Sequence, residues 1–132
     1  MFLEIKTTLF TFNTLITMVV RRFLLKEINR FRRENGKGNL HFHEAESKNA
    51  QRHSEHCARI GKNRHTDWPL GHNFNTELVS EINPDHKPEE RARITINGFK
   101  SSTEGHREAL LDAREHVAIG EKNGHTTVRL KT

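Results

Sequence analysis

The sequence predicts a single α+β domain, and three observations lead to this fold class. Apolar residues recur at helical spacing through the first half of the chain. Residues 62–77 are rich in loop-forming Asn, Pro and Gly, and the C-terminal residues alternate between apolar and polar at strand spacing. With 132 residues, the chain has room for one compact core. Helices followed by a closing hairpin are typical of a layered α+β domain.

Two helices are predicted in the first half. One runs from about Met18 to Asn35, and its apolar stripe consists of Val20, Leu24, Ile28 and Phe31. The next runs from about His43 to Arg59. Its narrow buried side consists of small residues, namely Ala50, Ser54, Cys57 and Ala58. Small residues permit close helix packing, so this helix is expected to lie tightly against its neighbour.

The second half is expected to begin with an extended segment, Leu78 to Ile82. Pro88 suits the first turn of a third helix. A fourth helix is expected to open at Ser102 or Thr103, both good N-caps, and to run to about Arg114. The tail then changes to strand spacing, and a hairpin signal joins its two halves at Asn123 and Gly124.

The net charge of +5 is concentrated in the first helix. Its basic residues are Arg21, Arg22, Lys26, Arg30, Arg32 and Arg33. No aromatic ladder or zinc-finger spacing accompanies them, which favours a solvated helix face over a nucleic-acid site. Cys57 is the only cysteine, so no intramolecular disulfide can form, and we expect this thiol to be buried.

Residues 1–17 are interpreted as a degenerate leader or an N-terminal extension, and residues 18–132 as the domain. The apolar part of this leader is too short and too polar to span a bilayer. It lacks a clear small-residue cleavage site, so the sequence leaves open whether it is a secretory signal.

Several motifs occur in the order found in one protein family. They are Ile28 to Gly36, Ala50 to Ser54, Arg64-His65-Thr66, Ser80-Glu81-Ile82 and the Gly105-His106-Arg107 motif that follows Ser102. This series resembles the bacterial branch of the CAP superfamily, which comprises the cysteine-rich secretory, antigen 5 and pathogenesis-related proteins. The resemblance implies a three-layer α-β-α sandwich with an antiparallel sheet, and a secreted or cell-surface protein.

The resemblance also implies a cleft lined by two histidines and two acids. The matching residues are His65, Glu81 and His106, with Glu104 nearest to the second acidic position. His65 and His106 would be the metal ligands, and two imidazoles with a carboxylate suit Zn²⁺. The same side chains without a metal would form a hydrogen-bonded polar cluster. Around Glu81 the chain departs from the family, which has Gly before this acid and Asn after it, where Ser80 and Ile82 stand here.

Three functions remain open on the sequence. The first is a monomeric binding module for a small-molecule, lipid or peptide ligand. The second is a zinc-assisted hydrolase with Glu81 or Glu104 as general base. The third is a basic-helix binder of nucleic acid or anionic membranes, for which we expect weak membrane-surface binding and no specific nucleic acid. The sequence contains no nucleophile elbow, phosphate-binding loop or HExxH motif, which favours the binding module.

Overall fold

The computed structural model describes the backbone of residues 2–132 and the side chains from residue 12 onward. Four helices and four strands follow one another along these residues. They are α1 (Phe2–Glu34), β1 (His41–Phe42), α2 (Glu44–Ile60), β2 (Thr76–Glu81), α3 (Pro88–Ser101), α4 (His106–Asp112), β3 (His116–Lys122) and β4 (His125–Leu130).

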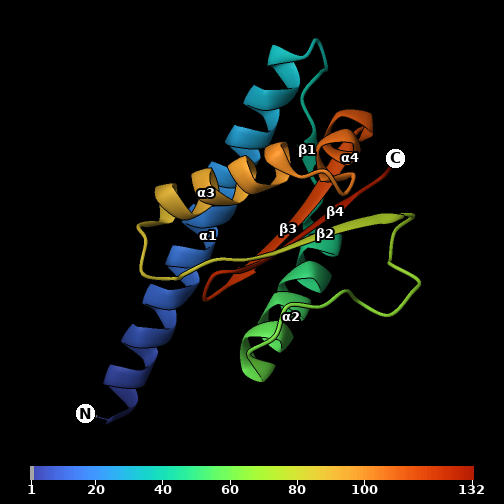
Figure 1. Ribbon diagram of the computed structural model, residues 1–132. Helices are drawn as coiled ribbons and strands as arrows, with labels where there is room; N and C mark the ends of the chain where they lie inside the picture. The colour runs from blue at the N-terminus through green and yellow to red at the C-terminus, as the bar shows by residue number, and fades with distance from the viewer. Residues whose placement is uncertain (1) are drawn as a thin grey trace.

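The strands form one sheet in the order β1-β3-β4-β2. β3, β4 and β2 pair antiparallel, as predicted, but the short β1 pairs parallel with β3, so the sheet is mixed. α2 covers one face of the sheet, and α1, α3 and α4 lie on the other side (Figure 1). The expected three-layer sandwich of helices around a sheet is confirmed.

The two faces of the sheet differ in chemistry. The apolar core lies between the sheet and α1, α3 and α4, and it contains Leu24, Ile28, Ile96, Leu110, Ile119 and Leu130. Because side chains alternate along a strand, the neighbours of the apolar strand residues point towards α2. In β2 and β4 those neighbours include Glu77, Thr127 and Arg129, all buried. The α2 side of the sheet is therefore a polar interior.

α2 also takes over part of the role of an edge strand. β1 ends at Phe42, opposite Val117, so the remainder of β3 lacks a strand partner on that side. Ser47 of α2 accepts a hydrogen bond from the backbone of Ile119, and Gln51 exchanges two hydrogen bonds with the backbone of Glu121. These bonds hold α2 at a fixed position on the sheet.

The first helix is longer than predicted, because α1 begins at Phe2 and residues 2–17 are helical; whether they are a leader or an extension stays a prediction. Its predicted stripe is confirmed, with Val20, Leu24, Ile28 and Phe31 all buried. One basic residue departs from the solvated face: the Arg32 guanidinium is buried and donates to the carbonyls of Leu110 and Leu111 at the end of α4. Within the described residues, no helix has both the length and the apolar character needed to cross a bilayer.

The predicted start of the fourth helix is wrong. Ser102 ends α3, and α4 begins only at His106, after Gly105 at φ 93°. Glycine adopts that left-handed conformation without a steric penalty, so the turn is placed there rather than at the hydroxyl residues. The third helix does start at Pro88, and the hairpin turn lies at Asn123 and Gly124, as expected.

Candidate functional site

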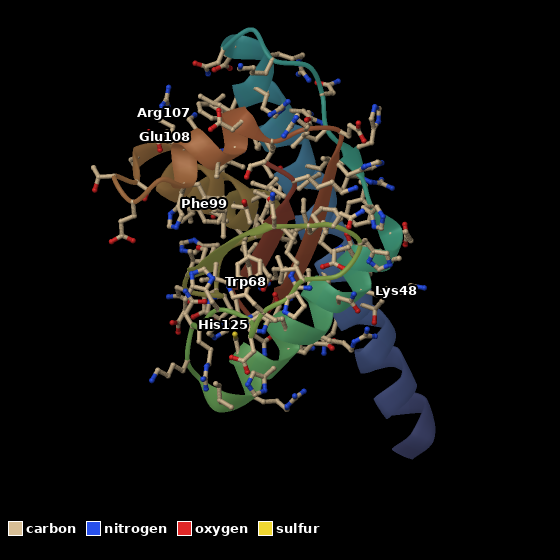
Figure 2. All side chains as sticks on the ribbon, turned by 90° about the vertical axis from the view of Figure 1, so that its right-hand side faces the viewer. Lys48, Trp68, Phe99, Arg107, Glu108 and His125 are labelled. Carbon is tan, nitrogen blue, oxygen red and sulfur yellow. The ribbon has the colours of Figure 1, made fainter. Side chains whose placement is uncertain are left out.

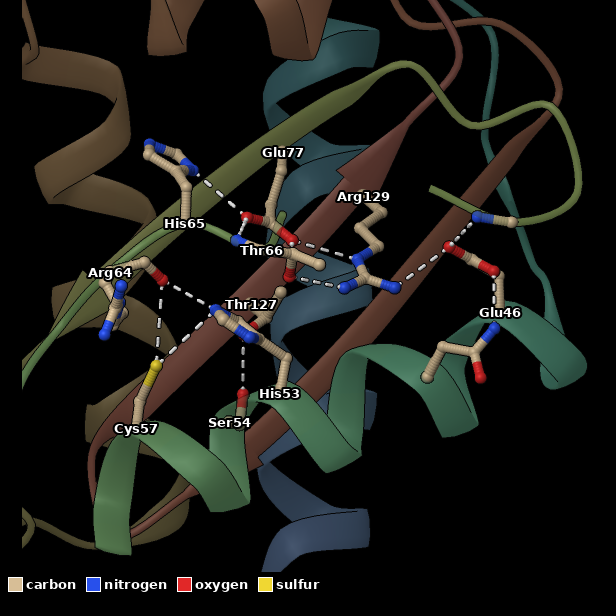
Figure 3. Close-up of polar contacts among 12 residues, drawn as sticks. Glu46, His53, Ser54, Cys57, Arg64, His65, Thr66, Glu77, Thr127 and Arg129 are labelled. Carbon is tan, nitrogen blue, oxygen red and sulfur yellow. Dashed lines mark hydrogen bonds and ion pairs between the residues drawn. The ribbon is translucent and has the colours of Figure 1, made fainter. Parts of the chain in front are cut away.

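A buried arginine links two buried carboxylates in the polar interior beneath α2. Arg129 of β4 donates to Glu77 of β2 and to Glu46 of α2, each at 3.0 Å (Figure 3). The arginine side chain is 4% exposed, and the two carboxylates are 2% and 0% exposed. A charge can be buried at this depth only if it is paired and hydrogen-bonded, as all three are here. We call Glu46, Glu77 and Arg129 the ion network.

The ion network anchors the long loop between α2 and β2, residues 61–75, at two points, and Glu77 makes the first of them. Glu77 accepts from the Thr66 backbone at 2.8 Å and from the Thr66 hydroxyl at 2.7 Å, and Nδ1 of His65 lies 3.1 Å from the same carboxylate. Burial alone would raise the pKa of Glu77, but the hydrogen bonds from Thr66 and His65 and the charge of Arg129 outweigh it and lower that pKa. Glu77 is therefore an ionised anchor and not a proton donor.

Glu46 holds the same loop at a second anchor point. Its carboxylate accepts from the Gly71 backbone at 3.2 Å and lies 2.9 Å from Nδ1 of His72. Burial would raise the pKa of Glu46, but hydrogen bonds from His72, Asn49 and Arg129 and the charge of Arg129 lower it. Because Arg129 bridges both carboxylates, the two anchor points of the loop, at residues 65–66 and 71–72, are fixed relative to each other.

Three imidazoles gather next to Glu46. The ring of His43 lies 4.9 Å from that of His72 and 5.4 Å from that of His116, measured between centroids. Nδ1 of His43 accepts from the Glu46 backbone and so caps α2. Burial lowers the pKa of His43, the charges of His72, His116 and Lys131 lower it further, and Glu46 opposes them. The neutral form of His43 is therefore favoured in the folded protein, and it is the form whose Nδ1 can accept the capping hydrogen bond.

These shifts predict that the domain loses stability in acid in two stages. The pKa of His43 in the folded state lies below its ordinary 6.5, so the unfolded chain takes up this proton first, and stability falls as the pH drops below 6.5. The pKa values of Glu46 and Glu77 lie below their ordinary 4.5, so their contribution is complete above 4.5 and is lost as the pH falls through the folded values. Urea unfolding at a series of pH values measures both stages.

His43→Asn separates the two stages, because asparagine also caps helices but does not titrate. We expect the variant to lose the decline that begins near pH 6.5 and to keep the decline below 4.5. A variant that follows the original chain at every pH would contradict the role given to His43.

An open groove of about 370 Å³ lies directly over the ion network. One wall is α2, the other is the anchored loop, and Arg129 is part of the floor. The groove is lined by Asn49, Arg52, His53, Thr66, Pro69, Leu70, Gly71 and Arg129. We call it the α2 groove. Trp68, which precedes Pro69, is 62% exposed and lies on this loop, apart from Arg107 and Glu108 of α4 (Figure 2).

A thiol and an imidazole meet at one end of the groove, but their hydrogen bonds do not suit nucleophilic catalysis. Sγ of Cys57 lies 3.5 Å from Nε2 of His53, and that same Nε2 lies 2.6 Å from the carbonyl oxygen of Arg64 (Figure 3). A carbonyl only accepts, so Nε2 carries the proton and cannot take one from the thiol. Cys57 is also buried, as predicted, and thus closed to substrate.

The structure gives each residue of the predicted cleft a separate neighbour. His65 contacts Glu77, the ring of His106 packs edge-on against Phe99 at 5.5 Å, and Glu81 lies 3.8 Å from His125. Glu104 is exposed, and its backbone donates to Ser102. Among the side chains from residue 12 onward, no hydrogen bond, ion pair or ring contact joins these four residues to one another.

The described residues contain no preformed cluster of metal-binding donors. In the part of the chain that the structure describes, no group of three or more His, Cys, Asp or Glu could hold one. Nδ1 of His65 is directed to a carboxylate that Arg129 already neutralises. The cleft formed by His65, Glu81, Glu104 and His106 therefore stays a prediction.

Sequence reasoning missed the ion network and the groove above it. One signal was available for the loop: Pro69, Gly71 and several Asn and His residues mark residues 62–77 as an irregular segment, and such loops often carry ligand-contacting groups. A second signal was Arg129, a charged residue between the apolar residues Val128 and Leu130 of the predicted hairpin. Because side chains alternate along a strand, Arg129 is expected on the sheet face opposite the apolar core, which a helix covers in a three-layer sandwich.

Comparison with known proteins decides the family. The model of the cysteine-rich secretory protein family, CAP, matches residues 25–123. The chain belongs to the CAP family. The matched range includes α2, β2, α3, α4 and β3, and it therefore contains Glu46, Glu77 and most of the α2 groove.

A solved structure shares the fold of this CAP domain. It is an extracellular protein containing an SCP domain from Bacillus anthracis strain Ames, with a TM-score of 0.62 and 14% sequence identity. The match covers 83% of this chain but only 39% of that protein, so the chain spans well under half of its relative. No curated protein sequence matches the chain significantly.

Proposed function

We propose that this CAP domain is a secreted binding module that takes a carboxylate-bearing peptide ligand in the α2 groove. The observation that carries the proposal is the ion network beneath the groove. It fixes the loop wall to the sheet before any ligand arrives, so binding does not have to order that loop. Sites that are organised in advance lose less free energy on binding.

The lining of the groove favours a peptide that carries negative charge. Arg52 is exposed on the α2 wall, and Arg64 is an exposed cation in the loop that forms the other wall. Asn49 adds an amide, and Pro69, Leu70 and the exposed Trp68 offer apolar surface for a neighbouring side chain. A guanidinium beside an aromatic anchor is a common arrangement in peptide recognition. Arg129 is already paired with two carboxylates, so Arg52 is the arginine that a ligand would meet.

A binding module fits the site better than a hydrolase. Burial would raise the pKa of both buried carboxylates, but hydrogen bonds from His72, Asn49 and Arg129 lower the pKa of Glu46. Hydrogen bonds from Thr66 and His65 and the charge of Arg129 lower the pKa of Glu77, so neither carboxylate can donate a proton near neutral pH. The hydroxyl of Ser54 is paired with that of Thr127 at 2.8 Å, and neither is activated by an imidazole. The described groove thus offers charge and hydrogen bonds but no activated nucleophile.

The only tryptophan of the chain reports on the proposed site. Trp68 emission can be followed during titration with a short acetylated oligoglutamate peptide and with an oligoglutamine peptide of equal length. We expect a saturating change with oligoglutamate alone, and a loss of affinity of about tenfold in Arg52→Gln, because one charge-assisted hydrogen bond is removed.

Arg59→Gln is the matched control, because it removes an exposed cation from the same helix outside the groove. This variant should bind like the original chain. Equal affinities for Arg52→Gln and Arg59→Gln, or an emission that does not respond to oligoglutamate, would refute the assignment of the ligand to the groove.

The predicted metal pair is tested separately. Calorimetry with Zn²⁺ on the original chain, His65→Ala and His106→Ala would reveal a shared site as a loss of binding in both variants. Equal heats in all three proteins would remove His65 and His106 as a ligand pair. Turnover of peptide or ester substrates that is abolished by a chelator and by Glu81→Gln would support the hydrolase in place of the binding module.

A further inference from the structure

The first helix carries an apolar patch that the domain leaves uncovered. Phe12, Leu15 and Met18 are 58%, 55% and 53% exposed, and they lie three residues apart along α1. That spacing places them on neighbouring turns of one helix face. More than half of each of these side chains is therefore left uncovered, and the helix extends beyond the other elements at its N-terminal end (Figure 1).

A row of cations continues the same face towards the C-terminal end of the helix. Arg22, Lys26, Arg30 and Arg33 are all exposed and recur every three or four residues after Met18. The buried residues Val20, Leu24, Ile28 and Phe31 occupy the opposite side of the helix. The exposed face therefore points away from the body of the domain. Its apolar residues come first along the helix, and its cations follow them. We call these seven residues the α1 stripe.

A shallow groove widens the apolar part of the α1 stripe. It has a volume of about 400 Å³ and includes Met18, Leu25 and Phe42 with Arg21 and Arg22 beside them, and one carboxylate, Glu44, faces Arg21 at its edge. The Arg21 guanidinium lies over the Phe42 ring at 4.8 Å. Apolar surface and positive charge thus occur next to each other here, as they do along the helix.

We propose that the α1 stripe binds the surface of an anionic phospholipid membrane. Phe12, Leu15 and Met18 would enter the boundary between headgroups and acyl chains, and Arg22, Lys26, Arg30 and Arg33 would lie among the lipid phosphates. A helix with large apolar residues and cations on its exposed side is suited to such a surface. The α2 groove lies on the other side of the sheet and stays open, so this inference does not depend on the proposed ligand.

Charge complementarity selects this occupant over the others. A second copy packed through the apolar residues would leave the four cations without partners, and a second copy packed along the whole stripe in parallel would bring like charges together. Nucleic acid would satisfy the cations but would leave Phe12, Leu15 and Met18 in water. An anionic bilayer satisfies both parts of the stripe at once.

The test is flotation of the full chain with vesicles of phosphatidylcholine, with and without phosphatidylserine, at low and high salt. We expect binding to the anionic vesicles that weakens with salt, and an affinity about fivefold lower for each cation removed in Arg22→Gln and Lys26→Gln. Phe12→Ser with Leu15→Ser should release the protein even at low salt.

Lys48→Gln with Lys62→Gln removes two exposed cations from α2 and the loop that follows it, on the other side of the sheet, and should leave vesicle binding unchanged. Circular dichroism verifies that each variant is folded. Binding that is equal for all variants, or absent from anionic vesicles, would overturn the proposal. Dimerisation in ultracentrifugation that Phe12→Ser abolishes would assign the stripe to a second copy, and salt-dependent binding to DNA without vesicle binding would assign it to nucleic acid.

Discussion

Replacing Arg129 with methionine is expected to destabilise the domain by about 3–5 kcal/mol, because two buried carboxylates lose their counter-charge. Glu46 and Glu77 are 0% and 2% exposed and cannot recover water without opening the interior. A loss of this size is a large fraction of the stability of a typical domain. Urea unfolding at neutral pH, followed by circular dichroism, measures it.

Two variants show whether charge is the cause. Arg30→Ala removes an exposed arginine whose pairing with Glu27 spans 3.7 Å, and it should cost no more than about 0.5 kcal/mol. Arg129→Met combined with Glu46→Gln and Glu77→Gln removes the uncompensated charges and should be more stable than Arg129→Met alone. A triple variant no better than the single one would show that lost packing, rather than unpaired charge, is responsible.

The second large effect is expected from Gly120→Ala in β3. A Cβ atom at this position would overlap the backbone of Ala50 and Gln51 in α2, since the helix approaches the strand there without a side chain between them. The collision involves main-chain atoms, so rotation of a side chain cannot relieve it. We expect a loss of about 3 kcal/mol, at the upper end of what overpacking usually causes.

Gly98→Ala is the matched control for this substitution. Gly98 lies in α3, is exposed, and has nothing within 4 Å of the position that a Cβ would take. Alanine is a better helix former than glycine, so this variant should gain up to about 1 kcal/mol. Thermal unfolding of the two variants beside the original chain compares them directly, and a Gly120→Ala protein as stable as the original would refute the close approach of α2 to β3.

Much of the fold was predictable from apolar spacing. Local patterns indicate the buried face of α1 and the C-terminal hairpin. They also indicate the small buried residues of α2, namely Ala50, Ser54 and Cys57. Ala58 is half-exposed, contrary to expectation. The start of α4 could not be predicted, because it depends on the positive φ of Gly105 and not on the hydroxyl residues before it.

The buried charges could not be placed by sequence reasoning, because their partners are distant in the chain. Arg32 reaches a carbonyl 78 residues away, and Arg129 reaches carboxylates 52 and 83 residues away. The spacing of apolar and polar residues along the chain cannot indicate which residues pair over such distances. The resemblance to the CAP family identified the fold and the loop that contains His65, but the groove became visible only once the ion network showed how that loop is anchored.

The most direct test of this account maps the ligand onto the domain. Amide NMR spectra of the labelled full chain, titrated with the oligoglutamate peptide, should change at residues 49–53 and 66–71, on the two walls of the α2 groove. Changes centred on Glu81 and residues 104–107, with the groove unaffected, would contradict the account and place the site in the cleft that the family resemblance implied.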